Sequence, residues 1–337
     1  MHLSEGNEII NDRDQKLIVQ TLLNSKEPAV QLKTYLRLFD HDYETKEVKK
    51  ITKDLKQSSK AIRNLLSYLP KNESTKLMYA YKKWQGVHWI LTDLADIGYP
   101  PGDHFLIPSR NYELQWLLSE KHWGRKKTIQ GRKRFCASQE GNGLYSILKL
   151  GLDDGRANLL AERLIKYQWD DGGWNCDTKP NAVNSSYHES IIPLRALNAF
   201  VKVTNDYKGR KAVECAAKVF LKRKLYKKLR NDEIIDQNWI KLHYPPYWHY
   251  DILIGLKVLT EVGKIKDPRC NDALDLLESK KLPDGGFPAD GKYYRTSGKY
   301  NFSPVNWGGT SKRELNVWVT IDALYVLKEA GRIDIEN

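Results

Sequence analysis

The chain has 337 residues, of which 41% are hydrophobic, and it carries a net charge of +13 with a heavy load of Trp and Tyr. This length allows one large domain or two ordinary ones, and the charge favours anionic partners, although a lysine-rich proteome would explain it equally well. The chain starts without an apolar signal-peptide core, no segment reaches the ~18 apolar residues of a membrane helix, and the four cysteines follow no disulfide or CxxC spacing. We therefore expect a cytoplasmic protein with free thiols.

Helical periodicity begins near the N-terminus, where apolar residues recur at helix spacing in residues 12–24, 27–40 and 59–69. The Lys-, Asn- and Ser-containing stretch 70–76 is interpreted as a linker. The sequence thus predicts an N-terminal helical extension over residues 1–75.

Two kinds of helix alternate from Trp84 onward. One kind opens with aromatic and polar residues, over 84–97, 139–150, 187–203, 248–262 and 315–330. The other kind is more charged, over 109–119, 156–168, 210–221 and 268–279. Glycines 151, 263 and 331 follow three of these helices as left-handed caps would, and Asp267-Pro268 is typical of a helix start. No strand pattern competes, so we expect an all-α fold of stacked or ring-closed helical hairpins.

Two turns in this region have nearly the same sequence, QWDDGGW at residues 168–174 and KLPDGGF at residues 281–287. Each follows an amphipathic helix and precedes a polar loop. We expect the Asp side chain to close the turn, the glycines to adopt positive φ, and the aromatic residue to pack back on the preceding helix. Self-similarity over such a distance indicates a repeat architecture.

The segment QWDDGGWNCD and the helix that follows it, NSSYHESIIPLRAL, resemble the QW motif of squalene–hopene cyclases and protein prenyltransferase β subunits. The resemblance covers about residues 80–331 and implies a single α/α toroid there, with the N-terminal extension outside it. In such a toroid the first helix of each pair lines a central cavity and its N-terminal end lies at the rim. The superfamily includes cyclases, prenyltransferases and non-catalytic members, so the motif indicates the fold more firmly than the reaction.

Titratable residues at the expected rim are the candidates for acid/base catalysis: Asp251, His249, His188, Glu189 and Glu140. The pair His249–Asp251 stands out, because an aromatic cavity raises the pKa of a carboxyl group and an imidazole can replenish its proton. In the plainer interpretation Asp251 is a helix N-terminal carboxylate and His249 a buried histidine. His188 and Glu189 diverge by about 100° on a helix, so both cannot face the cavity squarely.

Aromatic and polar residues near the same rim predict the wall of a substrate cavity, where aromatic faces could stabilise a carbocation. They are Trp84, His88, Tyr187, Tyr244, Tyr247, Trp248, Tyr250, Trp307 and Asn316. A basic, loop-like stretch at 121–135 supplies the anion-binding candidates Arg132, Lys133 and Arg134. A second basic stretch, 221–230, is interpreted mainly as a solvated helix face.

We expect no cofactor and no metal. Where prenyltransferases carry the Asp and Cys ligands of zinc, this chain has Asn184 and Ser186. A rearranged zinc site drawing on Cys176, His188 and His249 is the alternative. The DxDD and DDxxD motifs of terpene cyclases and synthases do not occur in the sequence.

The leading hypothesis is an enzyme similar to terpene cyclases and prenyltransferases that acts on an isoprenoid or other apolar ligand, with or without an anionic head. One alternative is a non-catalytic scaffold for an anionic partner, either nucleic acid, for which the chain has no recognition motif, or a lipid surface met peripherally. Another is a carbohydrate-active hydrolase, because paired carboxylates in a helical toroid suit glycosidic chemistry.

Overall fold

The computed structural model describes residues 15–70, 78–124 and 126–335, and these residues are mostly helical. This mostly helical content confirms the expected all-α character. Residues 15–23 are helical, and the predicted linker at 70–76 falls almost wholly outside the described residues. None of the helices in the described ranges combines the length and the apolar character needed to cross a bilayer.

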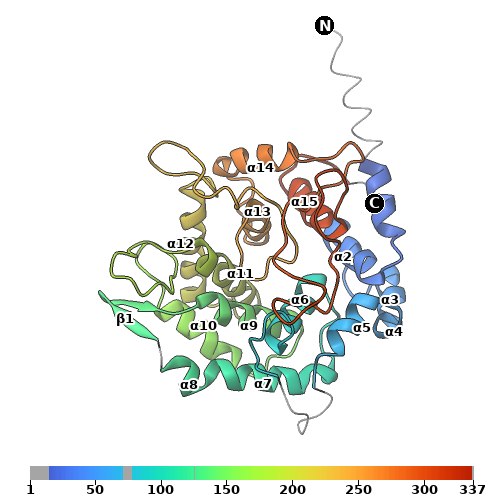
Figure 1. Ribbon diagram of the computed structural model, residues 1–337. Helices are drawn as coiled ribbons and strands as arrows, with labels where there is room; N and C mark the ends of the chain where they lie inside the picture. The colour runs from blue at the N-terminus through green and yellow to red at the C-terminus, as the bar shows by residue number, and fades with distance from the viewer. Residues whose placement is uncertain (1–14, 71–77, 125, 336–337) are drawn as a thin grey trace.

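One group of helices forms the interior of the molecule, and most of their side chains are buried. These are α2 (Pro28–Leu38), α6 (Val87–Ile97), α9 (Ala137–Lys149), α11 (Tyr187–Thr204), α13 (Ile252–Glu261) and α15 (Val317–Glu329). Neighbours pack in a cyclic order: α2 contacts α6, then α6 contacts α9, α9 contacts α11, α11 contacts α13, α13 contacts α15, and α15 contacts α2. Figure 1 shows them around the middle of the molecule.

The remaining helices cover the outside of this group (Figure 1). They are α3 (Lys46–Lys53), α4 (Leu55–Ser58), α5 (Lys60–Leu66), α7 (Ile107–Leu118), α8 (Glu120–Trp123), α10 (Ala157–Lys166), α12 (Tyr207–Leu221) and α14 (Asn271–Glu278), with 3₁₀ turns at His104–Leu106 and Pro268–Cys270. Helix α10 is typical, because Ala157, Leu160, Ala161 and Leu164 form one buried stripe. Asp267 caps as predicted, through its bond to the Arg269 amide, but it opens a 3₁₀ turn before α14.

The N-terminal region is not set apart from the rest of the chain. Helix α2 packs between α15 and α6, and the Lys33 side chain on its inner face is completely buried. The predicted boundary near residue 75 therefore does not separate two packing units among the described residues. Sequence periodicity misses α3 and α4, because these short, lysine-rich helices bury only Val48 and Leu55.

Both Asp-Gly-Gly turns form, but they follow the predicted architecture only in part. The amide of Gly172 donates to the carbonyl of Trp169 (2.9 Å), and that of Gly285 to the carbonyl of Leu282 (2.9 Å). Only the first glycine of each pair has positive φ, 104° and 81° respectively. Asp284 closes its own turn onto the Gly286 amide, as expected. Asp171 instead accepts from the amide of Ser185, at the far end of the following loop.

The aromatic residue after each turn is fully buried, as predicted. Trp174 donates through Nε1 to the carbonyl of Leu164 at the end of α10, 3.0 Å away. Its amide donates to the Ser190 hydroxyl of α11 (3.0 Å), and the amide of Phe287 donates to the Thr320 hydroxyl of α15 (2.9 Å). The two turns thus dock on the next inner helix in the same way, which identifies two copies of one structural unit.

A small hairpin departs from the all-α expectation within the basic stretch at 121–135. Strands β1 (Lys127–Ile129) and β2 (Arg132–Arg134) pair antiparallel. Gln130 and Gly131 between them both have positive φ, 51° and 74°, as a tight hairpin turn requires. Residues 127–134 of the stretch interpreted as a loop therefore form a β-ribbon.

Candidate functional site

His249 lies in an aromatic sandwich at the N-terminal end of α13. Its ring stacks on Tyr293 (centroids 3.4 Å apart, planes at 7°) and on Trp248 (4.0 Å). Burial, together with the nearby His243 and His188, lowers the pKa of His249 to about 2. The ring is therefore neutral at physiological pH and cannot replenish a proton on a neighbouring acid.

Asp251 pairs with a different histidine from the one expected. It caps α13 by accepting from the Ile254 amide (2.9 Å), and it accepts from both the amide (3.0 Å) and Nδ1 (2.7 Å) of His243. Burial opposes protonation of His243, but the Asp251 carboxylate outweighs it, so the pKa of His243 is raised. The plainer interpretation of Asp251, as a helix N-terminal carboxylate, describes its contacts.

The other predicted acids lie in separate places. Glu189 accepts from the amide of Ser138 (2.9 Å) at the start of α9, and burial raises the pKa of Glu189. Glu140 lies 3.5 Å from His122 Nε2 and 3.5 Å from Arg163. These two carboxylates therefore do not share the contacts of Asp251. His88, predicted to bind substrate, instead contacts Glu113 at 2.9 Å in a fully buried pair.

Several of the predicted wall aromatics pack against each other. Trp84 stacks on Tyr247 at 3.7 Å, and Tyr244 stacks on Trp318 at 5.4 Å. Tyr250 donates to the carbonyl of Leu225 (2.9 Å). Trp307 likewise donates to Ser303 (3.0 Å). The side-chain Nδ2 of Asn316 donates to the Trp307 carbonyl, while its side-chain Oδ1 caps α15. These side chains have structural partners within the core.

Charged side chains meet between α2, α6, α13 and α15. Lys33 pairs with Asp96 (3.1 Å) and Asp322 (2.9 Å), and Lys257 pairs with the same two carboxylates at 2.8 Å each. Burial alone would raise the pKa of Asp96, but Lys257, Lys33 and Arg195 hold it well below its usual range. Sequence reasoning missed this cluster, although lone charges inside apolar helices (ILIGLKVLT, VTIDALYVL) were a signal for it.

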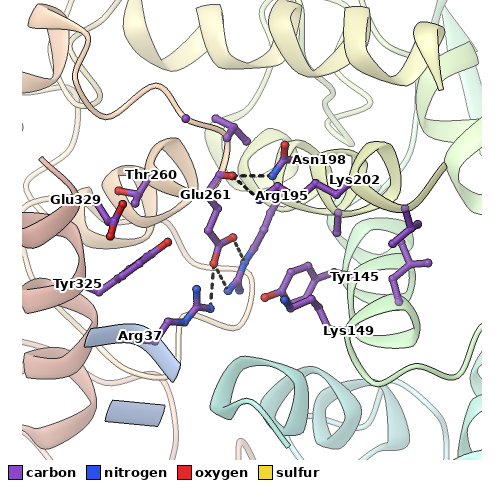
Figure 2. Close-up of a pocket in the computed structure, with 15 residues that line it drawn as sticks. Arg37, Tyr145, Lys149, Arg195, Asn198, Lys202, Thr260, Glu261, Tyr325 and Glu329 are labelled. Atoms are coloured by element: carbon purple, nitrogen blue, oxygen red, sulfur yellow. Dashed lines mark hydrogen bonds and ion pairs between the residues drawn. The ribbon is translucent and has the colours of Figure 1, made fainter. Parts of the chain in front are cut away.

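The cluster continues to a pocket of about 600 Å³ at the C-terminal ends of the inner helices (Figure 2). Glu261 forms ion pairs there with Arg195 (2.7 Å) and Arg37 (3.1 Å). Burial alone would raise the pKa of Glu261, but these two partners lower it to about 2. Lys149 and Lys202 line the same pocket, as does Glu329. The lining therefore has four cationic side chains against two carboxylates.

A second pocket, of about 490 Å³, opens at the N-terminal end of α11. Its wall includes Tyr187, His188 and Trp239, with Leu229 and Ile235. Its cationic residues are Arg223, Lys228 and Arg230, all from the basic stretch that was interpreted mainly as a solvated face. Apolar rings and cations thus share one pocket, which we call the α11 pocket.

His188 is the one predicted catalytic residue that lines the α11 pocket. Its Nδ1 accepts from the amide of Tyr250 (3.0 Å), so the neutral ring carries its proton on Nε2. Burial lowers the pKa of His188, which keeps the ring neutral near pH 7. His188 is therefore a hydrogen-bond donor through Nε2.

Two of the predicted anion-binding residues lie over an aromatic ring of the first Asp-Gly-Gly turn. Arg132 and Arg134 lie over Trp169, with centroid distances of 5.4 and 4.4 Å, and Lys133 donates to the carbonyl of Lys126 (2.8 Å). Arg134 is buried and donates to the carbonyl of Ala182 (2.6 Å). Each of these contacts is with another part of the protein.

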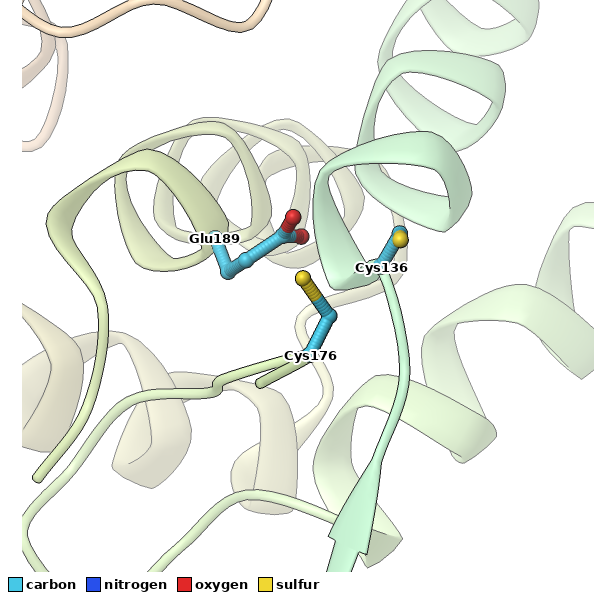
Figure 3. Close-up of side chains that lie close together, drawn as sticks. All are labelled: Cys136, Cys176 and Glu189. Carbon is cyan, nitrogen blue, oxygen red and sulfur yellow. The ribbon is translucent and has the colours of Figure 1, made fainter. Parts of the chain in front are cut away.

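One group of side chains in the described residues has the composition of a metal site. Cys136, Cys176 and Glu189 each place a ligand atom within 4.8 Å of the other two (Figure 3). Of the metal-ligand candidates named from the sequence, only Cys176 belongs to it. His188 bonds to Tyr250, and His249 is stacked between two rings.

Comparison of the sequence with models of protein families gives no match, and comparison with curated proteins finds no similar sequence.

Proposed function

We propose that the cyclic packing of α2, α6, α9, α11, α13 and α15 is an α/α toroid, and that the chain is an enzyme acting on an apolar ligand with an anionic head, such as an isoprenyl diphosphate. The toroid proposal is supported by the contact between α15 and α2, and by the equivalent docking of the two Asp-Gly-Gly turns. In this proposal α2 is part of the ring, although the sequence pattern placed it outside.

The composition of the α11 pocket is the observation that carries the functional proposal. Tyr187 and Trp239 stack at 4.5 Å and give the pocket an aromatic wall, while Arg223, Lys228 and Arg230 supply positive charge. Its volume of about 490 Å³ falls within the range of small-molecule sites. Such a pocket matches a ligand that has an apolar chain at one end and phosphate oxygens at the other.

The chemistry that suits this arrangement is ionisation of an allylic diphosphate. The C–O bond to the diphosphate breaks and its electron pair leaves with the diphosphate, whose charge the three cations balance. The allylic cation faces the aromatic rings of Tyr187 and Trp239 and is then captured by a nucleophile or loses a proton. His188 donates from Nε2 to a phosphate oxygen, a role that its neutral state permits.

Binding of farnesyl diphosphate to the purified chain, followed by calorimetry, tests this proposal. We expect Arg223→Gln to weaken binding about tenfold or more, since a charge-assisted hydrogen bond contributes about 1.5–3 kcal/mol. Trp239→Leu should also weaken binding, because it removes an aromatic face of the pocket wall. Lys211→Gln, an exposed cation of α12 outside the pocket, is the matched control. Farnesol and inorganic diphosphate should bind more weakly than the whole ligand. An absence of binding, or equal losses in the control, would contradict the proposal.

A non-catalytic scaffold for an anionic partner is the second candidate, favoured by the pocket of Figure 2 with its excess of cationic side chains. This function predicts salt-dependent retention on heparin that falls in a Lys149→Gln, Lys202→Gln double variant. In that case Arg223→Gln should leave retention unchanged, which separates the two candidates.

A further inference from the structure

Three side chains with metal-binding atoms converge beside the N-terminal end of α11. Cys136 immediately precedes α9, Cys176 lies in the loop after the first Asp-Gly-Gly turn, and Glu189 is in the first turn of α11. Figure 3 shows the thiol of Cys176 pointing toward the carboxylate of Glu189. The three residues come from separate segments, so the fold and not sequence adjacency brings them together.

The spacing of the three ligand atoms is close to that of a tetrahedral site. They lie within 4.8 Å of one another. Zinc bonds of about 2.0–2.3 Å correspond to ligand–ligand distances of about 3.3–3.8 Å. The ligand atoms therefore have to approach one another by about 1 Å to bind zinc. Rotation of the two cysteine side chains can supply this movement without moving the helices.

The charges around the cluster also favour a bound cation. Once a bound ion has displaced the thiol protons, two thiolates and one carboxylate carry three negative charges, and Lys126 is a cation that interacts electrostatically with both Cys136 and Glu189. A divalent ion together with Lys126 balances these charges. The Glu189 carboxylate is buried and its Oε2 is already held by the Ser138 amide, so its orientation is fixed before any ion binds.

We propose that Cys136, Cys176 and Glu189 bind one thiophilic divalent cation, zinc, with a fourth position open to water or to a ligand. Two sulfur ligands select zinc over magnesium or calcium, which prefer oxygen. Three protein ligands with an open position are typical of catalytic zinc sites. Within the described residues no further Cys, His, Asp or Glu belongs to the group. Both thiols are partly exposed, which gives the ion a route of entry.

This inference is independent of the ligand proposed for the α11 pocket, although the two sites share one helix end. Glu189 directly follows His188, which lines that pocket, while Glu189 itself is directed to α9. The zinc ligands are also not the prenyltransferase positions, which Asn184 and Ser186 occupy in this chain.

Cobalt substitution of the full chain, with its thiols kept reduced by a phosphine, tests the proposal. Co²⁺ bound to thiolates gives a sulfur-to-metal charge-transfer band, so we expect one equivalent to bind with that band. Cys136→Ser and Cys176→Ser should each remove about half of the band and weaken binding about tenfold or more. Glu189→Gln should keep the band while weakening binding. Cys215→Ser, which removes a thiol of α12 outside the cluster, should change neither.

Folding of each variant is checked by its circular dichroism spectrum. Zinc should raise the Tm of the unaltered chain and of Cys215→Ser, but not that of the two cluster cysteine variants. The proposal is overturned if the chain with four reduced thiols binds no Co²⁺, or if the band keeps its full intensity in the two cluster cysteine variants. A stable Cys136–Cys176 disulfide, with no metal bound after its reduction, would likewise overturn it.

Discussion

Lys33 of α2 and Asp322 of α15 form an ion pair of 2.9 Å in which the two side chains are only 0% and 5% exposed. Lys257 of α13 bridges Asp322 to Asp96 of α6, so side chains of four helices meet in one charge cluster. The hydroxyl of Tyr244 donates to Asp96 (3.0 Å) and supplies a further hydrogen bond. Buried charges are tolerated only when each has its partners, so the cluster fixes how these helices pack.

Replacing Lys33 with Met should destabilise the fold by about 3–5 kcal/mol, because it leaves buried carboxylates short of a partner. Urea unfolding followed by fluorescence measures this as a lower midpoint. Lys49→Met is the matched control, since Lys49 pairs with Glu44 at the surface, where 57% and 81% of the two side chains are exposed. The control substitution should lower the free energy of unfolding by no more than about 1 kcal/mol. Similar losses in both variants would show that the buried pair has no special role.

Stability should fall in acid as Glu261 becomes protonated. Its pKa is lowered from 4.5 to about 2 in the folded protein, where Arg195 and Arg37 outweigh the effect of burial. A group with a depressed folded pKa stabilises the protein above its unfolded pKa, and this stabilisation is lost as the pH falls from about 4.5 to about 2. The loss attributable to Glu261 is on the order of 3 kcal/mol.

Denaturation midpoints measured between pH 2 and pH 7 test that dependence. The slope below pH 4.5 should be shallower in Glu261→Gln than in the unaltered chain. Glu44→Gln, which alters an exposed carboxylate, should leave the slope as it is. If the slope is unchanged in Glu261→Gln, the ion pairs of this residue do not cause the acid sensitivity.

Histidine titration by NMR should separate His243 from His249. Because Asp251 raises the pKa of His243, that ring should titrate above its usual 6.5, whereas His249 should stay neutral down to about pH 2. Because the pKa of His243 is higher in the folded than in the unfolded protein, the stabilisation from its pairing with Asp251 is fully present below the unfolded pKa. It is lost as the pH rises through the folded pKa. Asp251→Asn should therefore move the His243 titration to lower pH. An unchanged titration in that variant would refute the pairing.

The second glycine of each Asp-Gly-Gly turn should not tolerate a methyl group. A Cβ on Gly173 would lie 2.4 Å from the Ser190 hydroxyl oxygen, and one on Gly286 would lie 2.5 Å from Cβ of Leu315. Overpacking of this kind costs about 1–3 kcal/mol, which thermal unfolding of Gly173→Ala and Gly286→Ala would measure. Gly291→Ala, where nothing lies within 4 Å, should be close to neutral. Unequal effects at the two turns would mean that the two units are packed differently.

The parts of the structure that follow from local sequence were predictable. The aromatic residue after each turn is buried, and Trp174 packs back on the preceding helix as expected. Gly151, Gly263 and Gly331 adopt the expected positive φ, 62°, 70° and 70°. The inner helices lie within a few residues of their predicted ranges, since their long apolar runs leave little ambiguity.

Contacts between distant segments were not predictable from the same patterns. Asp251 was paired with His249, two residues away, whereas the fold turns His243 onto it. Likewise, nothing in the spacing of Cys136, Cys176 and Glu189 reveals that three separate segments meet. Periodicity shows which face of a helix is buried, but the partner of a buried polar group depends on which helices become neighbours.

The pairing of Lys33 with Asp322 also has a consequence for the order of events during synthesis. A ribosome delivers α2 among the first helices and α15 as the last of the inner ones. Until Asp322 has emerged, the ammonium group of Lys33 has only one of its two carboxylate partners. The nascent chain must therefore keep this lysine hydrated until α15 has emerged, and the interior can close only after that.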